Sequence, residues 1–402
     1  MSATDTGSRL TSVRIRGFRS VRDVAFEPRA ITALVGEARA GKSNVLAALR
    51  ALLDPEAPPP APEDISVYGG EAIHVEARLE SGARISLGCR PPEDAVVQRD
   101  GAPAVVYLPA ALRSGELIGS RRSRNTAATQ VLERFRRALR EPPSGSEAGP
   151  ALALVRAVED VVEADLTGTL LLVEEPELFL RPQAQRYLYR LLRSFALAGN
   201  QVIYSTHSPA FLNVGRLEEL VLVEHRSPAG TRVTQPQPLD ADEAFRVVSE
   251  FDAERSELFL ARAAVLVEGR TEQLVLPAVF LALGYDPDRA AISIIECGGK
   301  SNIPIFARIC RVCRVPCVAV HDRDAEPGED PIPAEIRLNA LIAEMVGAEW
   351  TVELAPDFEG IAGLRGHSNK PERAWRHFST PGVEVPEALA RVVELAVRAA
   401  RS

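Results

Sequence analysis

The sequence has few cysteines, no long apolar run and no excess of positive charge, and each shortage excludes a class of protein. An odd number of cysteines, five in 402 residues, argues against a framework of disulfide bonds. No apolar run is long enough to span a bilayer, and the first ten residues lack the apolar segment of a signal peptide. A formal net charge of −8 excludes a diffuse nucleic-acid binder. We therefore expect a cytoplasmic protein without a membrane partner, and any contact with DNA would have to come from local basic patches.

The cysteines also lack the spacing of a metal cluster. Cys310, Cys313 and Cys317 are close in sequence, but they lie on a predicted helix that runs into a strand, with no fourth ligand nearby. A free cysteine is usually a small buried hydrophobic residue. We therefore interpret these three cysteines as part of a core.

Strand-like and helix-like patterns alternate along the chain and predict an α/β fold. Residues 12–35 alternate apolar and polar side chains, and a helical pattern follows over 42–53. From residue 151 the pattern becomes helix, strand, helix, strand, with buried strands at 169–173 and 201–205. This alternation is typical of a mostly parallel sheet.

A second α/β series follows, and a length of 402 residues suits two or three domains. Its strands are expected at 264–267, 291–295 and 317–321. We place the boundary near 240–262 and assign 1–250 to the first domain and 251–402 to the second.

A phosphate-binding loop is predicted at residues 36–43, which read Gly-x-x-x-x-Gly-Lys-Ser between a strand and a helix. The backbone N–H groups of such a loop and the N-terminus of the helix face the phosphates. We expect Lys42 to reach the β- and γ-phosphates and Ser43 to bind Mg²⁺. The predicted cofactors are therefore ATP and Mg²⁺. The predicted nucleotide-binding residues are Gly36, Ala40, Gly41, Lys42, Ser43, Asn44 and Glu174.

Two further features support a nucleotide site. The apolar run 169–173 ends in Glu174 and Glu175, so one carboxylate can join the Mg²⁺ shell while the other polarises the attacking water. His207 follows the next predicted strand, where it can contact the γ-phosphate. Acids at strand ends are common and a lone histidine is usually structural, so each signal gains its weight from the others.

A second set of acids follows two strands in the second half of the chain. Glu268 ends one predicted strand, and Asp322 and Asp324 directly follow another. Because the carboxyl ends of parallel strands lie on one edge of a sheet, we expect these carboxylates to converge. Converging carboxylates repel one another unless a cation joins them, and oxygen ligands favour Mg²⁺ or Mn²⁺. The alternative is a set of solvated acids at strand ends, which needs no metal.

In chain order, the loop, the paired acids and the histidine resemble the ABC-type ATPases of the RecF and SMC group over residues 12–225. The resemblance implies that Glu174 contacts Mg²⁺, that Glu175 is the catalytic base and that His207 is the switch histidine. That group also has a Ser-Gly-rich signature that acts across a dimer. Residues 144–147 read Ser-Gly-Ser-Glu and match this signature poorly.

The second set of acids resembles the Toprim domain, where a strand-end Glu and an Asp-x-Asp pair hold Mg²⁺ for phosphodiester chemistry. An ABC-type ATPase followed by a Toprim domain is the arrangement of the OLD (overcoming lysogenization defect) family of endonucleases, which the sequence resembles over nearly its whole length. The resemblance implies that Glu359 adds a metal ligand and that Lys370 stabilises charge on the scissile phosphate. For Lys370 the alternative is an exposed surface lysine.

The sequence departs from that family in two places. It lacks the helical insertion that many members use to dimerise, and it reads Leu-Arg-Pro at 180–182 where a histidine is expected before the proline. A homodimer is still the expected assembly, with a defence-system protein as a further partner.

We therefore predict an α/β protein with an ABC-type P-loop ATPase domain followed by a Toprim domain, acting as an ATP-hydrolysing, metal-dependent DNA endonuclease in phage defence or DNA repair. Its catalytic residues would be Glu175, His207 and Lys370. Two Mg²⁺ or Mn²⁺ ions would activate water and stabilise the leaving oxygen. Their predicted ligands are Glu268, Glu272, Asp322, Asp324, Glu326 and Glu359.

Three alternatives accompany these predictions. The arginine-rich segments 121–124 and 134–140 are the predicted phosphate contacts, although such a run is often a solvated helix face. One alternative function is an ATPase switch whose Toprim domain does not cut and only binds DNA or a partner effector. Another is an interaction protein of an antiphage system that needs a separate effector.

Overall fold

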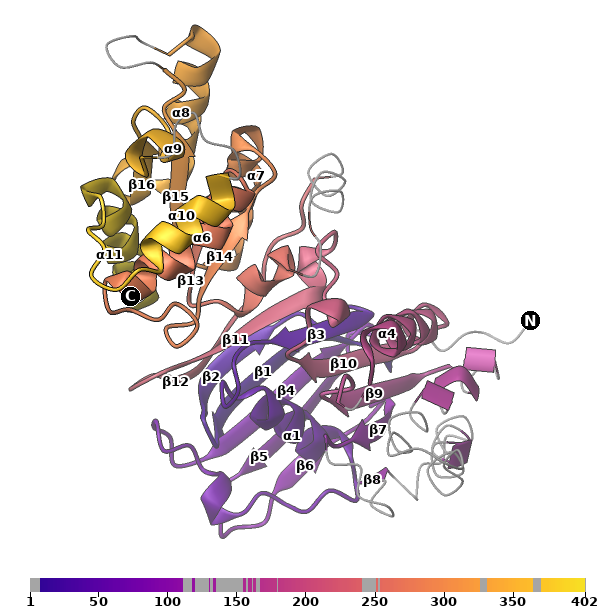
Figure 1. Ribbon diagram of the computed structural model, residues 1–402. Helices are drawn as coiled ribbons and strands as arrows, with labels where there is room; N and C mark the ends of the chain where they lie inside the picture. Colours follow the sequence, from indigo (N-terminus) through magenta and orange to yellow (C-terminus); the bar gives the residue numbers. More distant parts are fainter. Residues whose placement is uncertain are drawn as a thin grey trace. The chain divides into compact units, whose positions relative to one another are not determined.

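The chain divides into two compact units, Met1–Pro238 and Leu239–Ser402, each built around its own sheet (Figure 1). The division falls somewhat before the predicted boundary between residues 250 and 251. The computed structural model describes residues 8–110, 118–119, 130, 133–134, 155–156, 158–160, 162–163, 167–178, 180–240, 251, 254–325, 331–363 and 370–401. Across these ranges, none of the helices combines the length and the apolar character needed to cross a bilayer.

A large sheet forms the N-terminal unit, in the strand order β6-β5-β4-β1-β2-β12-β11-β3-β10-β9-β7-β8. Its strands are β1 (Leu10–Phe18), β2 (Val21–Phe26), β3 (Ile31–Val35), β4 (Ile73–Leu79), β5 (Arg84–Cys89), β6 (Val96–Gln98), β7 (Ala104–Leu108), β8 (Ile118–Gly119), β9 (Thr169–Glu174), β10 (Gln201–Thr206), β11 (Leu220–Arg226) and β12 (Gly230–Thr234). Its helices include α1 (Lys42–Leu53) and α4 (Pro182–Leu197).

The pairing of these strands explains the two sequence patterns. Strands β7, β9, β10, β3 and β11 pair in parallel, and β3, β9 and β10 are buried along nearly their whole length, which gives continuous apolar runs. Strands β2, β1, β4 and β5 are antiparallel neighbours with alternating burial, so one face is buried and the other is exposed. Helix α1 packs on the inner face of the sheet, against β1, β4 and β5 and against β7, β9 and β10, and fills the core with Val45, Leu46 and Leu49 (Figure 1).

A smaller parallel sheet in the order β14-β13-β15-β16 forms the C-terminal unit. Its strands are β13 (Ala263–Val267), β14 (Ile292–Glu296), β15 (Cys317–Asp322) and β16 (Thr351–Leu354). Its helices are α6 (Arg270–Ala282), α7 (Ile303–Cys313), α8 (Pro333–Val346), α9 (Phe358–Ile361), α10 (Lys370–Phe378) and α11 (Glu387–Arg401). The α/β fold predicted from the sequence is therefore confirmed in both units.

The cysteines and the segment before β13 can be compared with two local predictions. All five cysteines are free, and Cys310 and Cys313 are buried in the C-terminal unit, as expected for small core residues, whereas Cys317 is half-buried. The spacing of apolar residues also predicts a helix near 241–259, most of which lies outside the described residues. Its last part, Arg255–Leu260, is a 3-10 helix rather than an α-helix.

Candidate functional site

The phosphate-binding loop connects β3 to α1, and two of its glycines are required by close backbone packing. A Cβ on Gly36 would lie 1.9 Å from the carbonyl oxygen of Val223, and a Cβ on Gly41 would lie 2.1 Å from Oγ1 of Thr231. Gly41 also adopts a φ of 108°, which strongly favours glycine. Helix α1 begins directly afterwards at Lys42, so the N–H groups of its first turn are available to an anion.

Lys42 is held tightly inside this loop. Lys42 is only 4% exposed, and its Nζ donates to the carbonyl oxygens of Gly36 at 2.8 Å and Glu37 at 2.9 Å. The same Nζ lies 3.0 Å from Nε2 of His207. Burial lowers the pKa of Lys42 to about 8, although the nearby Glu175 and Glu177 carboxylates oppose the shift.

The predicted base and the predicted switch histidine meet beside this lysine. Oε1 of Glu175 lies 3.2 Å from Nε2 of His207. Glu175 has a φ of 44°, a left-handed conformation that is uncommon for a residue with a side chain and that is often found where an active site fixes a group. Its backbone N–H donates to the carbonyl oxygen of Ser205 at 3.0 Å, which holds the conformation. The structure thus brings together Lys42, Glu175 and His207 from three elements.

Glu174 lies at the end of β9, on the side of its neighbour β7. Its Oε2 accepts the backbone N–H of Ala110 at 3.2 Å, and burial together with the Glu174 carboxylate raises the pKa of Tyr107. Ser43 is exposed at the first turn of α1.

Glu177 is a residue of this site for which no role is predicted from the sequence. Its Oε1 accepts two hydrogen bonds from the segment after β10, at 2.9 Å from Oγ1 of Thr206 and at 2.6 Å from the backbone N–H of His207. Glu177 is 9% exposed, its Oε2 is buried without a hydrogen-bond partner among the described residues, and burial raises its pKa. The carboxyl group therefore connects the acidic segment after β9 to the loop that carries His207. Its place in the run Glu-Glu-Pro-Glu was the available signal.

The second set of acids gathers at the carboxyl edge of the small sheet. Glu268 follows β13 and Asp322 ends the neighbouring β15; Oε1 of Glu268 accepts the backbone N–H of Asp322 at 2.6 Å. Burial raises the pKa of Glu268 to about 7, and burial together with the Glu268 carboxylate raises that of Asp322 to about 8. Two neighbouring carboxyl groups with raised pKa values are difficult to ionise together, and a bound cation would stabilise both of them in the charged form.

Other predicted ligands surround this pair. Glu272 on α6 is 8% exposed; burial raises its pKa, and the nearby Glu359 carboxylate adds to the rise. Oδ1 of Asp322 accepts the N–H of Phe358 at 2.8 Å, so the segment that carries Glu359 is fixed to the pair. In the part of the chain that the structure describes, however, no three or more His, Cys, Asp or Glu side chains are close enough to share one metal ion.

Asp324 has a protein cation as its partner. Nζ of Lys300 lies 2.7 Å from Oδ2 of Asp324, 2.7 Å from the carbonyl oxygen of Asp322 and 3.0 Å from Oε2 of Glu335. Lys300 is 7% exposed, so this ammonium group balances charge inside the acidic edge. In the sequence, Lys300 is the last residue of the Gly-Gly-Lys run at 298–300, and this short run does not predict the contact with Asp324.

Several predicted residues cannot be placed. Glu326, residues 144–147 and the arginine-rich segment 121–124 lie outside the described residues, as does most of 134–140. Within that last segment Arg134 donates to the carbonyl oxygen of Asp160 at 3.1 Å. Lys370 begins α10, but its side chain lies outside the described part.

Fold and sites together define a P-loop domain followed by a Toprim domain. Comparison with family models agrees. Residues 259–324 match the family described as "Overcoming lysogenization defect protein-like, TOPRIM domain". Residues 151–213 match the family described as "AAA domain, putative AbiEii toxin, Type IV TA system".

Known proteins extend the comparison. The chain is 36% identical over 250 residues to the OLD nuclease of Thermus scotoductus, covering 56% of this chain and 47% of that protein. It is 26% identical over 170 residues to the Old nuclease of Escherichia phage P2, covering 40% of this chain and 29% of that protein. A solved SMC head domain from Thermotoga maritima shares 15% identity, with a TM-score of 0.37, over 57% of this chain and 99% of that one. The resemblance to the OLD family is thereby confirmed, and the chain aligns with less than half the length of these two nucleases.

Proposed function

We propose that the chain binds and hydrolyses ATP in its N-terminal unit and cuts DNA with Mg²⁺ or Mn²⁺ in its C-terminal unit. The observation that carries the proposal is the carboxyl pair of Glu268 and Asp322, with pKa values raised to about 7 and about 8, in a chain with a separate phosphate-binding loop. The relatives named OLD nuclease support the choice of DNA cleavage.

In the ATP site, Lys42, Ser43, Asn44 and Glu174 would hold the nucleotide with its Mg²⁺, together with the backbone of the loop. The bound Mg²⁺ would neutralise charge on the phosphates. Glu175 orients the attacking water and takes its proton, because its carboxylate projects from the end of β9 toward Lys42 and His207. His207 positions Glu175 through Nε2, and Glu177 positions His207 through its backbone N–H.

In the Toprim site, the donor set fits a divalent cation at Glu268 and Asp322, with Glu272 and Glu359 close by. The bound cation would supply an activated water and stabilise the leaving oxygen. Lys300 keeps Asp324 in place, and Lys370 is proposed to stabilise charge on the scissile phosphate. Glu326 stays a proposed ligand.

One observation favours a second candidate function. Because no three ligands among the described side chains are close enough to share one metal, the Toprim domain of an ATPase switch could bind DNA without cutting it. The proposed assembly is a homodimer, and the proposed role is phage defence or DNA repair.

The two candidates are separated by a plasmid assay with Mg²⁺ or Mn²⁺, with and without ATP. We expect nicking by the wild type, none by Asp322→Asn, and some metal-dependent nicking by Lys42→Ala, because the two sites use different residues. Asp322→Asn should hydrolyse ATP at the wild-type rate. The matched control is Glu353→Gln, which removes an exposed acid from the neighbouring strand β16 and should nick normally. If Asp322→Asn nicks as fast as the wild type, the Toprim domain is not the nuclease and the switch function stands.

A further inference from the structure

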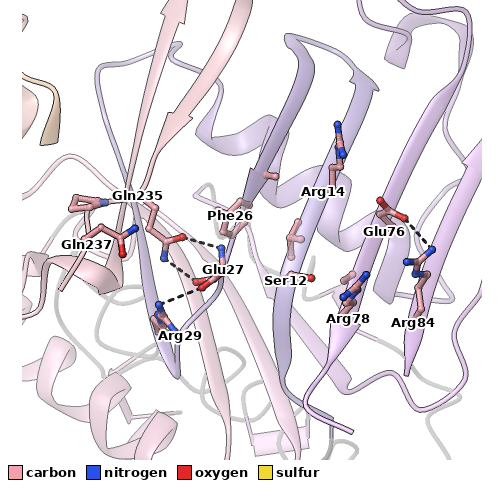
Figure 2. Close-up of a pocket in the computed structure, with 14 residues that line it drawn as sticks. Ser12, Arg14, Phe26, Glu27, Arg29, Glu76, Arg78, Arg84, Gln235 and Gln237 are labelled. Carbon is pink, nitrogen blue, oxygen red and sulfur yellow. Dashed lines mark hydrogen bonds and ion pairs between the residues drawn. The ribbon is translucent and has the colours of Figure 1, made fainter. Parts of the chain in front are cut away.

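A groove lined with arginines crosses the exposed face of the antiparallel strands in the N-terminal unit (Figure 2). Its volume is about 510 Å³, and its floor is formed by β1 and β2, with β4 and β5 on one side and residues 235–237 on the other. The charged residues that line it are Arg14, Arg29, Arg78, Arg84, Glu27 and Glu76. This surface lies in a different part of the unit from the phosphate-binding loop.

Strand register places two of these arginines directly opposite each other. Arg78 on β4 pairs with Arg84 on β5, and alternation puts both on the exposed face while Ala77 and Ile85 are buried. Like charges at directly opposite positions destabilise an antiparallel pair. Arg78 has no carboxylate partner in the ranges that the structure describes. The fold therefore keeps two cations side by side, with only a 3.9 Å contact from Glu76 to Arg84 to offset them, and an anion from outside would relieve them further.

The carboxylates of the groove only partly balance its arginines. Four arginines and two glutamates line it, which leaves a net charge of +2 in a chain whose formal charge is −8. Arg14 is held by Asp23, outside the lining, through two hydrogen bonds at 3.0 and 2.8 Å. The pairs within the lining are long and exposed: Arg84 to Glu76 at 3.9 Å and Arg29 to Glu27 at 3.4 Å. Exposed pairs of this kind contribute little, so a phosphate can replace the carboxylate, and guanidinium groups match phosphate geometry well.

The groove lacks a surface on which bases could stack. Phe26 is the aromatic residue among the described residues that line it, and it is only 4% exposed. The side chain of Gln235 is already engaged with the backbone of Glu27 and Glu218 (Figure 2). Proteins that bind single strands stack bases on aromatic side chains, whereas most hydrogen bonds between proteins and duplex DNA, including many from arginine, go to the phosphate backbone. The chemistry of this surface therefore suits duplex DNA without sequence preference.

We propose that this groove binds the phosphate backbone of duplex DNA and guides the substrate of the nuclease along the ATPase domain. The inference rests on the proposed function, since it supplies the path of that same substrate. It also makes Glu76 an internal competitor: its carboxylate lies 3.8 Å from Arg16 and 3.9 Å from Arg84, where a phosphate would otherwise bind.

Two variants with opposite expectations test the groove. A labelled 30-base-pair duplex is titrated in EDTA at several salt concentrations, with affinity read from fluorescence anisotropy. Arg78→Gln with Arg84→Gln should reduce the magnitude of the salt slope by about 1.8, since each phosphate contact contributes about 0.9. Glu76→Gln should tighten binding. The matched control, Arg186→Gln with Arg190→Gln, removes two exposed arginines from α4 of the same unit and should match the wild type.

The outcomes separate this inference from the function on which it rests. In the paired arginine variant, ATP hydrolysis without DNA should be unchanged and the temperature of thermal unfolding should not fall, because removing two opposed like charges does not loosen the sheet. A wild type that nicks plasmid, together with an arginine variant that keeps the wild-type salt slope, overturns the groove and leaves the nuclease standing. A wild type that neither binds the duplex nor nicks plasmid overturns both.

Discussion

Replacing Asp322 with asparagine tests the electrostatics of the carboxyl pair that β13 and β15 share. Asparagine keeps an oxygen for the N–H of Phe358, which lies 2.8 Å from Oδ1 of Asp322, but it removes the charge. Burial and Glu268 raise the pKa of Asp322 from 3.8 to about 8. The side chain is thus neutral in the folded chain over a pH range in which it is ionised in the unfolded chain.

The sign of the effect follows from proton binding. Between about pH 4 and pH 8 the folded chain binds the extra proton, so the stability of the wild-type C-terminal unit falls as pH rises and levels off above the folded pKa. The variant does not lose stability in this way. The difference in unfolding free energy between the variant and the wild type can therefore widen by up to about 1.4 kcal/mol per pH unit. From pH 5 to pH 8 the upper bound is about 4 kcal/mol. Because the side chain is only half-buried, solvent screens the charge, and we expect about 2 kcal/mol.

The assay uses the two tryptophans of the chain, Trp350 and Trp375, which both lie in the C-terminal unit. Urea unfolding followed by tryptophan fluorescence in EDTA therefore reports that unit alone. At pH 8, Mn²⁺ should stabilise the wild type and leave the variant unchanged, while Glu353→Gln should follow the wild type throughout. A stability difference that is the same at pH 5 and pH 8 would refute the reasoning, since it would mean that Asp322 titrates at its ordinary pKa.

The other predictions concern ATP hydrolysis. Glu175→Gln should bind ATP with wild-type affinity and hydrolyse it at least about a hundredfold more slowly, because glutamine keeps the shape of the base but cannot accept the proton. A wild-type rate would place the base elsewhere. Glu177→Ala should lower kcat with little change in KM and destabilise the N-terminal unit by about 1–3 kcal/mol, since Thr206 and His207 lose their acceptor. Glu177→Gln keeps an acceptor oxygen and should restore kcat. Equal steady-state kcat values for the wild type, Glu177→Ala and Glu177→Gln would mean that Glu177 has no part in the mechanism.

The elements that carry the sites could be predicted because local rules constrain them strongly. A buried strand, a turn that admits only glycine at Gly36 and Gly41, and a helix beginning at Lys42 follow from spacing and side-chain size alone. In the second unit, parallel pairing forces the ends of β13 and β15 to the same edge, so the approach of Glu268 to Asp322 follows from strand order.

Contacts made by loops could not be predicted in the same way. Glu177 reaches His207, which is 30 residues further along, because of the left-handed φ at Glu175, and no periodic pattern encodes that angle. Lys300 reaches Asp324 through a glycine turn and a second left-handed residue. The arginine groove depends on the register between β4 and β5, where a slip of one residue would move Arg84 to the buried face.

We expect the hydrogen bonds around His207 to connect ATP binding to the proposed base. An ammonium group has three protons, and Lys42 has three neighbours for them: the carbonyl oxygens of Gly36 and Glu37, and Nε2 of His207, which accepts in the tautomer that carries its proton on Nδ1. A γ-phosphate within reach of Lys42 must therefore displace at least one of them. Nε2 also lies 3.2 Å from Oε1 of Glu175, yet a ring nitrogen that accepts from Lys42 cannot donate to a carboxylate. Where the phosphate replaces His207 on Lys42, Nε2 can carry a proton and hold Glu175, and we therefore expect the proposed base to be oriented when the γ-phosphate is in place.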